Sequence, residues 1–326
     1  MLVNVDLNVL NFIFTYLPCL NDLIKMNSLP LWGIDLGGTK IEGVILPSLA
    51  DPKPILRMRI DTEGHLGYEH VIHQIHTLIG QMKSASGLAP SSIGFGTPGI
   101  LDPVLKTMKN CNSTSLNGMP LQCDLEKKLG VPVVLANDAN CFALAETHWG
   151  VVKEKQPDAK MVFGIILGTG VGGGIVFEGK IWNGKHGIAG EWGHNFLHES
   201  GGPCYCGKTG CVETVLSGPG LQRHYKEISG HEKKLNQIVQ DMDDPFAKKT
   251  VERLHEYFGK AVSVITNILD PDVIVIGGGV GNIESLYHEG VMSLSKYIFN
   301  NRLSVPILKP SLGDSAGVFG AAALVA

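Results

Sequence analysis

The sequence has no surplus of charge of either sign. Its 326 residues include 27 Lys and Arg against 31 Asp and Glu, and the net charge of −4 is spread along the chain. Proteins that hold nucleic acid or anionic membranes through charge gather basic residues into a patch. Because no stretch of this chain does so, we expect neither nucleic acid nor a membrane as a partner.

Long hydrophobic runs are also missing. The apolar stretch over residues 9–17 is shorter than the ~20 residues of a membrane span, and Lys25 is the only base in the first 25 residues, which argues against a secretory signal. We expect residues 1–29 to be an N-terminal extension, either disordered or the product of a gene start placed too early, with translation beginning at Met26. A short helix packed on the surface is the alternative.

The length and the hydrophobic content of 44% suffice for two packed cores. Apolar stretches and helical periodicities alternate from Leu31 onwards, which indicates an α/β protein. The segment 31–46 is expected to form a strand, a turn and a second strand, and further strands lead into SSIGFGTPGI (91–100) and lie at 131–135 and 272–276, with a hairpin over 162–182. The expected helices lie at 68–84, 121–129, 139–149, within 219–269 and from 316. We predict a small domain over 30–134 plus 310–326 and a large domain over 135–309.

Glycine is abundant, yet the phosphate-binding pattern G-x-x-x-x-G-K-[ST] is absent. The glycines of LGTGVGGG (167–174) have the spacing of a dinucleotide-binding turn, but strand-forming residues follow them where a helix would be needed. The segment therefore predicts a glycine hairpin, and GIDLGGTKIEGVI (33–45) predicts a second one. Backbone N–H groups in such turns can hold phosphates. Asp35, at the end of a strand, either caps the first turn or holds Mg²⁺ through water.

One histidine and three cysteines have the spacing of a structural zinc site. His194, Cys204, Cys206 and Cys211 supply a closed tetrahedral set without an open position for water, which disfavours a zinc hydrolase. Cys204 and Cys206 are too close for a comfortable disulfide. The other cysteines are expected to be small buried hydrophobes, and reduced thiols indicate the cytoplasm. These are Cys19, Cys111, Cys123 and Cys141.

Several polar residues are candidates for binding hydroxyl groups. Glu191 and Glu213 flank the zinc loop, which would hold them rigidly. Asn137 and Asp138 follow an apolar strand, where they either cap the next helix or face a ligand. A phosphoryl transfer needs a carboxylate that accepts the proton of the attacking hydroxyl, and Asp138 is our choice. The polar stretch 110–118 is either a plain loop or a sugar contact through Asn112.

Eight motifs resemble those of sugar kinases of the ROK family and cover nearly all of the chain beyond Leu31. They are DLGGTK (35–40), GTPG (96–99), NDANCFALAE (137–146), LGTGVGGG (167–174), GEWGH (190–194), CYCGKTGCVE (204–213), DPDVIVIGGG (270–279) and GDSAGVFGAA (313–322). The resemblance implies the actin-like ATPase or hexokinase-type (ribonuclease H-like) fold, with two domains and a cleft.

Within the family, the chain is most similar to bacterial fructokinases of the mannokinase/fructokinase type. This resemblance implies an ATP-dependent hexose 6-kinase acting on fructose. N-Acetylglucosamine kinase or glucokinase is the alternative, and a non-catalytic sugar-sensing regulator is the alternative of another class. The chain departs from the similar fructokinases at three positions. Ser115 stands where they carry an aromatic residue, Leu312 stands where His is usual, and Phe319 stands where Arg is usual.

The resemblance also implies roles for individual residues, together with Mg²⁺ as a cofactor and a homodimer. Asp138 would be the catalytic base. Phosphates would meet Gly37, Gly38, Thr39, Lys40, Gly168, Thr169, Gly170, Gly172 and Gly173, and adenosine would pack near Gly278 and Gly279. The sugar would contact Asn112, Asn137, Asp138, Glu191, His194 and Glu213.

Overall fold

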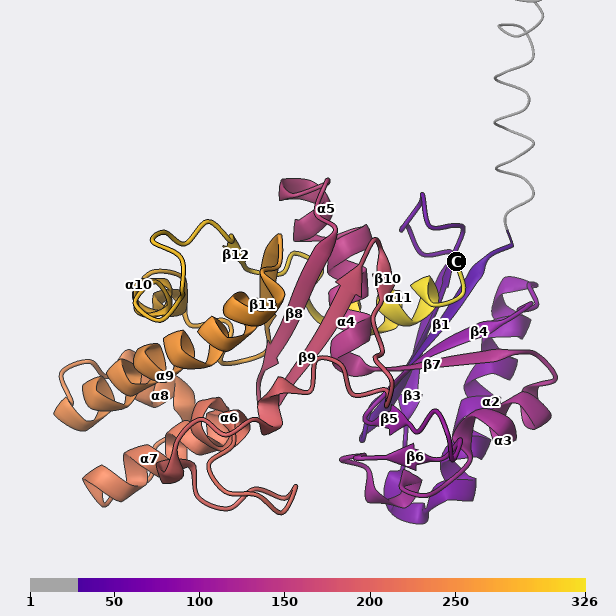
Figure 1. Cartoon of the computed structure of the whole chain (residues 1–326). Coiled ribbons are helices and arrows are strands. Elements are labelled where there is room, and N and C mark those ends of the chain that lie inside the picture. The colour runs from indigo at the N-terminus through magenta and orange to yellow at the C-terminus, as the bar shows by residue number, and fades with distance from the viewer. Residues whose placement is uncertain (1–28) are drawn as a thin grey trace, which may run out of the picture.

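Two five-stranded mixed sheets stand next to each other in the computed structural model, which describes residues 29–326 (Figure 1). The expectations for the N-terminal extension and for Cys19 lie outside the described residues. The first sheet has the order β3-β2-β1-β4-β7 and the second β10-β9-β8-β11-β12. The strands of the first are β1 (Leu31–Leu36), β2 (Lys40–Leu46), β3 (Leu56–Asp61), β4 (Ile93–Thr97) and β7 (Val133–Asn137). Those of the second are β8 (Met161–Leu167), β9 (Val171–Phe177), β10 (Lys180–Ile181), β11 (Val273–Gly277) and β12 (Ile307–Leu308).

Both sheets are built around the same arrangement of three strands. An antiparallel hairpin, β1–β2 or β8–β9, has its first strand paired in parallel with a later strand, β4 or β11. Each glycine motif therefore lies at a strand-to-strand turn, as the sequence predicts, and not at the start of a helix. The predicted domain boundary at residue 134 falls inside β7, which continues the first sheet to Asn137.

Helices cover the outer faces of both sheets. On the first sheet these are α2 (Tyr68–Ser86) and α3 (Leu121–Leu129), and their apolar residues share a core with β1 and β4. The second core unites β8, β9 and β11 with α6 (Val212–Leu216), α7 (Gly218–Ser229), α9 (Pro245–Leu269) and α10 (Glu289–Leu294). A smaller cluster packs α8 (Leu235–Gln240) against α7 and α9. No helix in residues 29–326 has the length and apolarity that a membrane crossing requires.

Two helices fill the space between the sheets (Figure 1). These are α4 (Asp138–His148) and α11 (Ala316–Ala323), and with the short α5 (Val151–Lys155) they form a third core that takes apolar residues from both sheets. The two helices cross at Gly320, where a Cβ atom would lie 1.8 Å from the Cys141 carbonyl oxygen. Only glycine permits this approach, so the packing of the two halves depends on it.

Three expectations need correction. The edge strand β3 was not predicted, because two arginines alternate with its apolar residues. The short hairpin of β5 (Ile100–Leu101) and β6 (Met108–Lys109) was also missed. Cys123 is exposed on α3, where the helix buries Leu121 and Leu125 instead, whereas Cys111 and Cys141 are buried as expected.

Candidate active site

A cavity of about 170 Å³ lies where the carboxyl end of β7, the β8–β9 turn and the loop after β10 meet. All six residues that the sequence assigned to the sugar line it, although they come from positions up to a hundred residues apart. They are Asn112, Asn137, Asp138, Glu191, His194 and Glu213. The structure thus brings these side chains together at one edge of the first sheet.

Asn137, and not Asp138, caps helix α4. The Asn137 Oδ1 atom accepts the backbone N–H of Asn140 at 2.8 Å, and its Nδ2 atom donates to Glu191 Oε1 at 3.2 Å. The Asp138 carboxylate accepts only the adjacent N–H of Ala139 among the described residues. A capping role therefore does not explain Asp138, and its carboxylate remains free to face the cavity.

Carboxylates are concentrated at this site, and their surroundings make them less acidic. Asp138 is open to the cavity but lies deep between the two sheets, and this burial raises its pKa. Burial, the Asp138 carboxylate and the Glu213 carboxylate raise the pKa of Glu191, against the opposing hydrogen bond from Asn137. Burial, followed by the charges of Asp138 and Glu42, raises the pKa of Asp35 to about 6. Groups with such shifts in a cleft are typical of functional sites.

The β8–β9 turn forms one wall of the cavity through Gly168, Thr169 and Gly170. Glu213 Oε2 accepts the Val171 N–H at 3.0 Å, which fixes this turn to helix α6. The two later glycines are already part of β9, and a Cβ on Gly173 would lie 2.5 Å from the Trp192 ring. Close packing accounts for Gly173 without a phosphate.

Gly278 and Gly279 follow β11 and lie beside the same turn. The φ angle of Gly278 is 86°, and a Cβ there would be 2.3 Å from the Leu167 carbonyl oxygen. The N–H of Gly218, at the start of α7, donates to the Gly168 carbonyl oxygen at 2.8 Å. Three backbone turns therefore meet at this point. Gly278 permits their close packing, and the space beside Gly168 is open.

The first glycine hairpin, from Gly37 to Lys40, lies in the β1–β2 turn and does not line this cavity. Thr62, a residue that sequence reasoning missed, anchors it by donating from Oγ1 to the Gly37 carbonyl oxygen at 2.8 Å. The Ser113 hydroxyl would lie 3.5 Å from a Cβ on Gly38. The loop that carries Asn112 therefore lies against the first hairpin.

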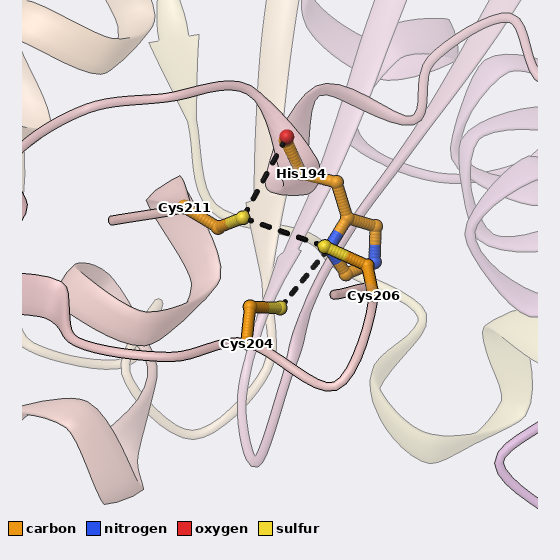
Figure 2. Close-up of side chains that lie close together, drawn as sticks. All are labelled: His194, Cys204, Cys206 and Cys211. Carbon is orange, nitrogen blue, oxygen red and sulfur yellow. Dashed lines mark hydrogen bonds between the residues drawn. The ribbon is translucent and has the colours of Figure 1, made fainter. Parts of the chain in front are cut away.

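The four predicted metal ligands cluster at the edge of the cavity (Figure 2). Their ligand atoms lie within 4.8 Å of one another, with Cys204 Sγ 3.6 Å from His194 Nδ1 and Cys206 Sγ 3.6 Å from Cys211 Sγ. One nitrogen and three sulfur ligands at this spacing fit a tetrahedral zinc ion. His194 ends a short helical turn (Trp192–His194), and the three cysteines come from the loop that leads to α6.

Sequence reasoning missed Tyr205, whose hydroxyl lies 2.9 Å from His194 Nε2 and which lines the cavity. Its place between two metal ligands was the available signal. Asn117 was missed as well: its side chain bonds the backbone N–H and carbonyl of Cys111 and so shapes the loop of Asn112. Ser115, which replaces an aromatic residue of the similar fructokinases, lies in the short helical turn Thr114–Leu116 and does not line the cavity.

Comparison with known proteins gives the family. An N-acetyl-D-glucosamine kinase of Vibrio parahaemolyticus is 36% identical over 90% of this chain and 98% of its own length. The structure is similar to a ROK hexokinase from Thermus thermophilus, with a TM-score of 0.81 and 29% identity over 90% of this chain and 97% of the other. It is also similar to a ROK family glucokinase from Streptomyces griseus in complex with glucose and AMPPNP, with a TM-score of 0.73 and 26% identity over 90% and 98% of the chains. These likenesses agree with the expected hexokinase-type fold. The ROK family model matches residues 31–326, and the chain belongs to the ROK family.

Proposed function

We propose that the protein is an ATP-dependent sugar kinase and that it phosphorylates the 6-hydroxyl group of N-acetyl-D-glucosamine. The observation that carries the kinase assignment is the Asp138 carboxylate, free of a capping role and placed beside the glycine turn at 168–170. The name of the Vibrio relative supports the amino sugar. The first expectation from sequence, fructose, gives way to its stated alternative.

Asp138 acts as the general base in this proposal. A raised pKa makes its carboxylate a better proton acceptor for the attacking hydroxyl. Asn112, Asn137, Glu191 and Glu213 bind the other hydroxyl groups and hold the sugar for attack. Bound Mg²⁺ would neutralise charge on the phosphates. Asp35 would hold that ion through water, beside the first hairpin.

In this proposal His194 contacts both the metal and the sugar. Its Nδ1 atom faces the cysteine sulfurs, and its Nε2 atom points to the Tyr205 hydroxyl and the cavity. Zinc on Nδ1 would fix the ring and leave the Nε2 N–H as a donor for a sugar oxygen. The six described cysteines are free, which supports a reducing compartment, the cytoplasm. The homodimer remains part of the proposal and is checked by light scattering.

The test is an ADP-release assay over N-acetylglucosamine, N-acetylmannosamine, glucose, mannose and fructose. We expect N-acetylglucosamine to have the highest kcat/KM. Asp138→Asn should lower kcat by about 10²- to 10⁴-fold, as for loss of a general base, whereas Asp158→Asn on the surface should not change it. A sensor without catalysis would bind a sugar yet release no ADP in either protein, and that result would refute the kinase.

A further inference from the structure

A large groove adjoins the sugar cavity. It has a volume of about 1060 Å³ and shares Asn110, Glu191, His194 and Tyr205 with the smaller cavity. The groove continues past these residues along the face of the second sheet beside helix α9, because Phe163 of β8, Ile175 of β9 and Val264 of α9 also line it. It is several times larger than the cavity itself, so a ligand held in the cavity has room to extend into it.

The shared residues lie where the cavity opens into the groove. Asn137, Asp138 and the turn at 168–170 line the cavity only, whereas Glu191, His194 and Tyr205 line both spaces. In a pyranose, C2 lies across the ring from C5, the atom that bears C6. A sugar with its 6-hydroxyl at Asp138 therefore directs its C2 substituent towards the groove.

The walls of the groove are suited to an aliphatic chain. Ile188, Val264 and Ile268 line it, and they are 46%, 45% and 75% exposed although they are apolar. Two lysines also line the groove. The Lys109 ammonium group is bound to Asp102 Oδ2 at 2.9 Å and to the His186 carbonyl oxygen at 3.1 Å, whereas Lys208 is exposed in the zinc loop. The wall at Ile188, where the Lys109 charge is paired, therefore favours an apolar substituent.

We propose that the groove is a subsite for the acyl group on the C2 nitrogen, and that the protein accepts 2-acylamino sugars with acyl chains longer than acetyl. The inference rests on the proposed function, because it places the reacting hydroxyl at Asp138. An acetyl group has only two carbons and occupies the mouth of the groove beside Tyr205. Propionyl and butyryl chains continue along Ile188.

The experiment compares kcat/KM for N-acetyl-, N-propionyl- and N-butyrylglucosamine. Each buried methylene is worth about a fourfold gain in binding, so KM should stay level or fall as the chain lengthens. Ile188→Trp should fill the groove and raise KM for the butyryl sugar by about tenfold, while changing KM for the acetyl sugar by less than about twofold. Leu105→Trp, at an exposed position that lines neither cavity, is the matched control and should change neither.

The outcomes separate the two proposals. Turnover of N-acetylglucosamine with rejection of N-butyrylglucosamine by the wild-type protein would overturn the subsite and leave the proposed function intact; a second copy of the chain that fills the groove would give this result. An equal rise in KM for the acetyl and butyryl sugars in Ile188→Trp would also contradict the subsite. If only sugars without an acylamino group are phosphorylated, both the proposed substrate and the subsite are wrong.

Discussion

At the scale of single residues, Asp35 shows how a buried carboxylate costs stability. It lies in register with Gly96 on one side and Glu42 on the other, and a Cβ on Gly317 would be 2.8 Å from its Oδ2 atom. Burial and the neighbouring carboxylates raise its pKa to about 6 from 3.8. The folded protein therefore holds the Asp35 proton more tightly than the unfolded chain does. The free energy of unfolding falls as the pH rises from 3.8 to about 6, because the folded state must then hold a buried charge.

Asp35→Asn should make the protein more stable at pH 7.5 by roughly 1–3 kcal/mol, because it removes a buried charge and keeps the shape of the side chain. The gain in Tm should shrink as the pH is lowered and disappear below about pH 3, where the wild-type side chain is protonated in both states. Phosphorylation should fall sharply in the same variant. A Tm difference that does not depend on pH would contradict the assignment of the shift to Asp35.

The residues of the site were predictable where their chemistry allowed few other uses. His194 and three cysteines in one loop point to a metal, and Asn137 with Asp138 after an apolar strand points to a ligand edge. Tyr205 and Thr62 could not be found in this way. Their importance comes from single contacts, to His194 Nε2 and to the Gly37 carbonyl oxygen, and these exist only after the chain has folded.

At the scale of elements, the zinc loop connects the metal ligands to the sugar site. Cys206 is an exposed ligand, whereas Glu191 and Glu213 lie just outside the ligand set and line the cavity. Arg223 donates to the carbonyl oxygens of Gly201 and Thr214, so the loop is tied to helix α7 as well. Loss of the metal should therefore displace Glu191 and Glu213, the proposed sugar-binding groups, and leave Asp138, the proposed base, in its place.

Cys206→Ser should lose the one zinc ion per chain that we expect in the wild-type protein, as measured by elemental analysis. The KM for the sugar should rise by about 10- to 100-fold, the usual cost of disordering groups that support a site, with a smaller change in kcat. Cys123→Ser, at an exposed position on α3 outside the cluster, is the matched control. Full sugar affinity in a zinc-free preparation would show that the loop holds its shape without metal.

Elements with a strong local pattern were predictable, and β3 shows why others were not. Its residues alternate between half-buried apolar side chains and exposed or charged ones, and Arg57 and Arg59 both bind the buried Glu42 on β2. An edge strand with two arginines resembles a polar loop until its partner strand is known. The β1–β2 and β8–β9 hairpins, by contrast, carry their turns and strand-forming residues in one short segment.

At the scale of the whole molecule, helices α4 and α11 join the two sheets. Helix α11 lies against Gly33 of β1 and Gly94 of β4, and α4 lies against Gly164 of β8. At each of these glycines a Cβ atom would approach the helix within 2.6 Å. The sequence shows these glycines but gives no sign of which helix each one meets, so the packing of the halves could not be predicted. Asp138 begins α4, and Asp35 adjoins the start of α11.

The crossing of these helices should therefore influence both stability and catalysis. Gly320→Ala places a methyl group where the Cys141 carbonyl oxygen stands 1.8 Å away, so the helices must separate, and we expect a loss of at least about 3 kcal/mol in the free energy of unfolding. Gly80→Ala, in α2 with open space around it, should instead leave stability unchanged or raise it by up to about 1 kcal/mol. Thermal melts compare the stability of the two variants, and the ADP-release assay below the melting range follows their activity.

Because separation of α4 from α11 moves Asp138 relative to Asp35, kcat should fall in Gly320→Ala alone. A destabilised variant with full kcat would show that the crossing holds the sheets together without setting the distance between the two carboxylates.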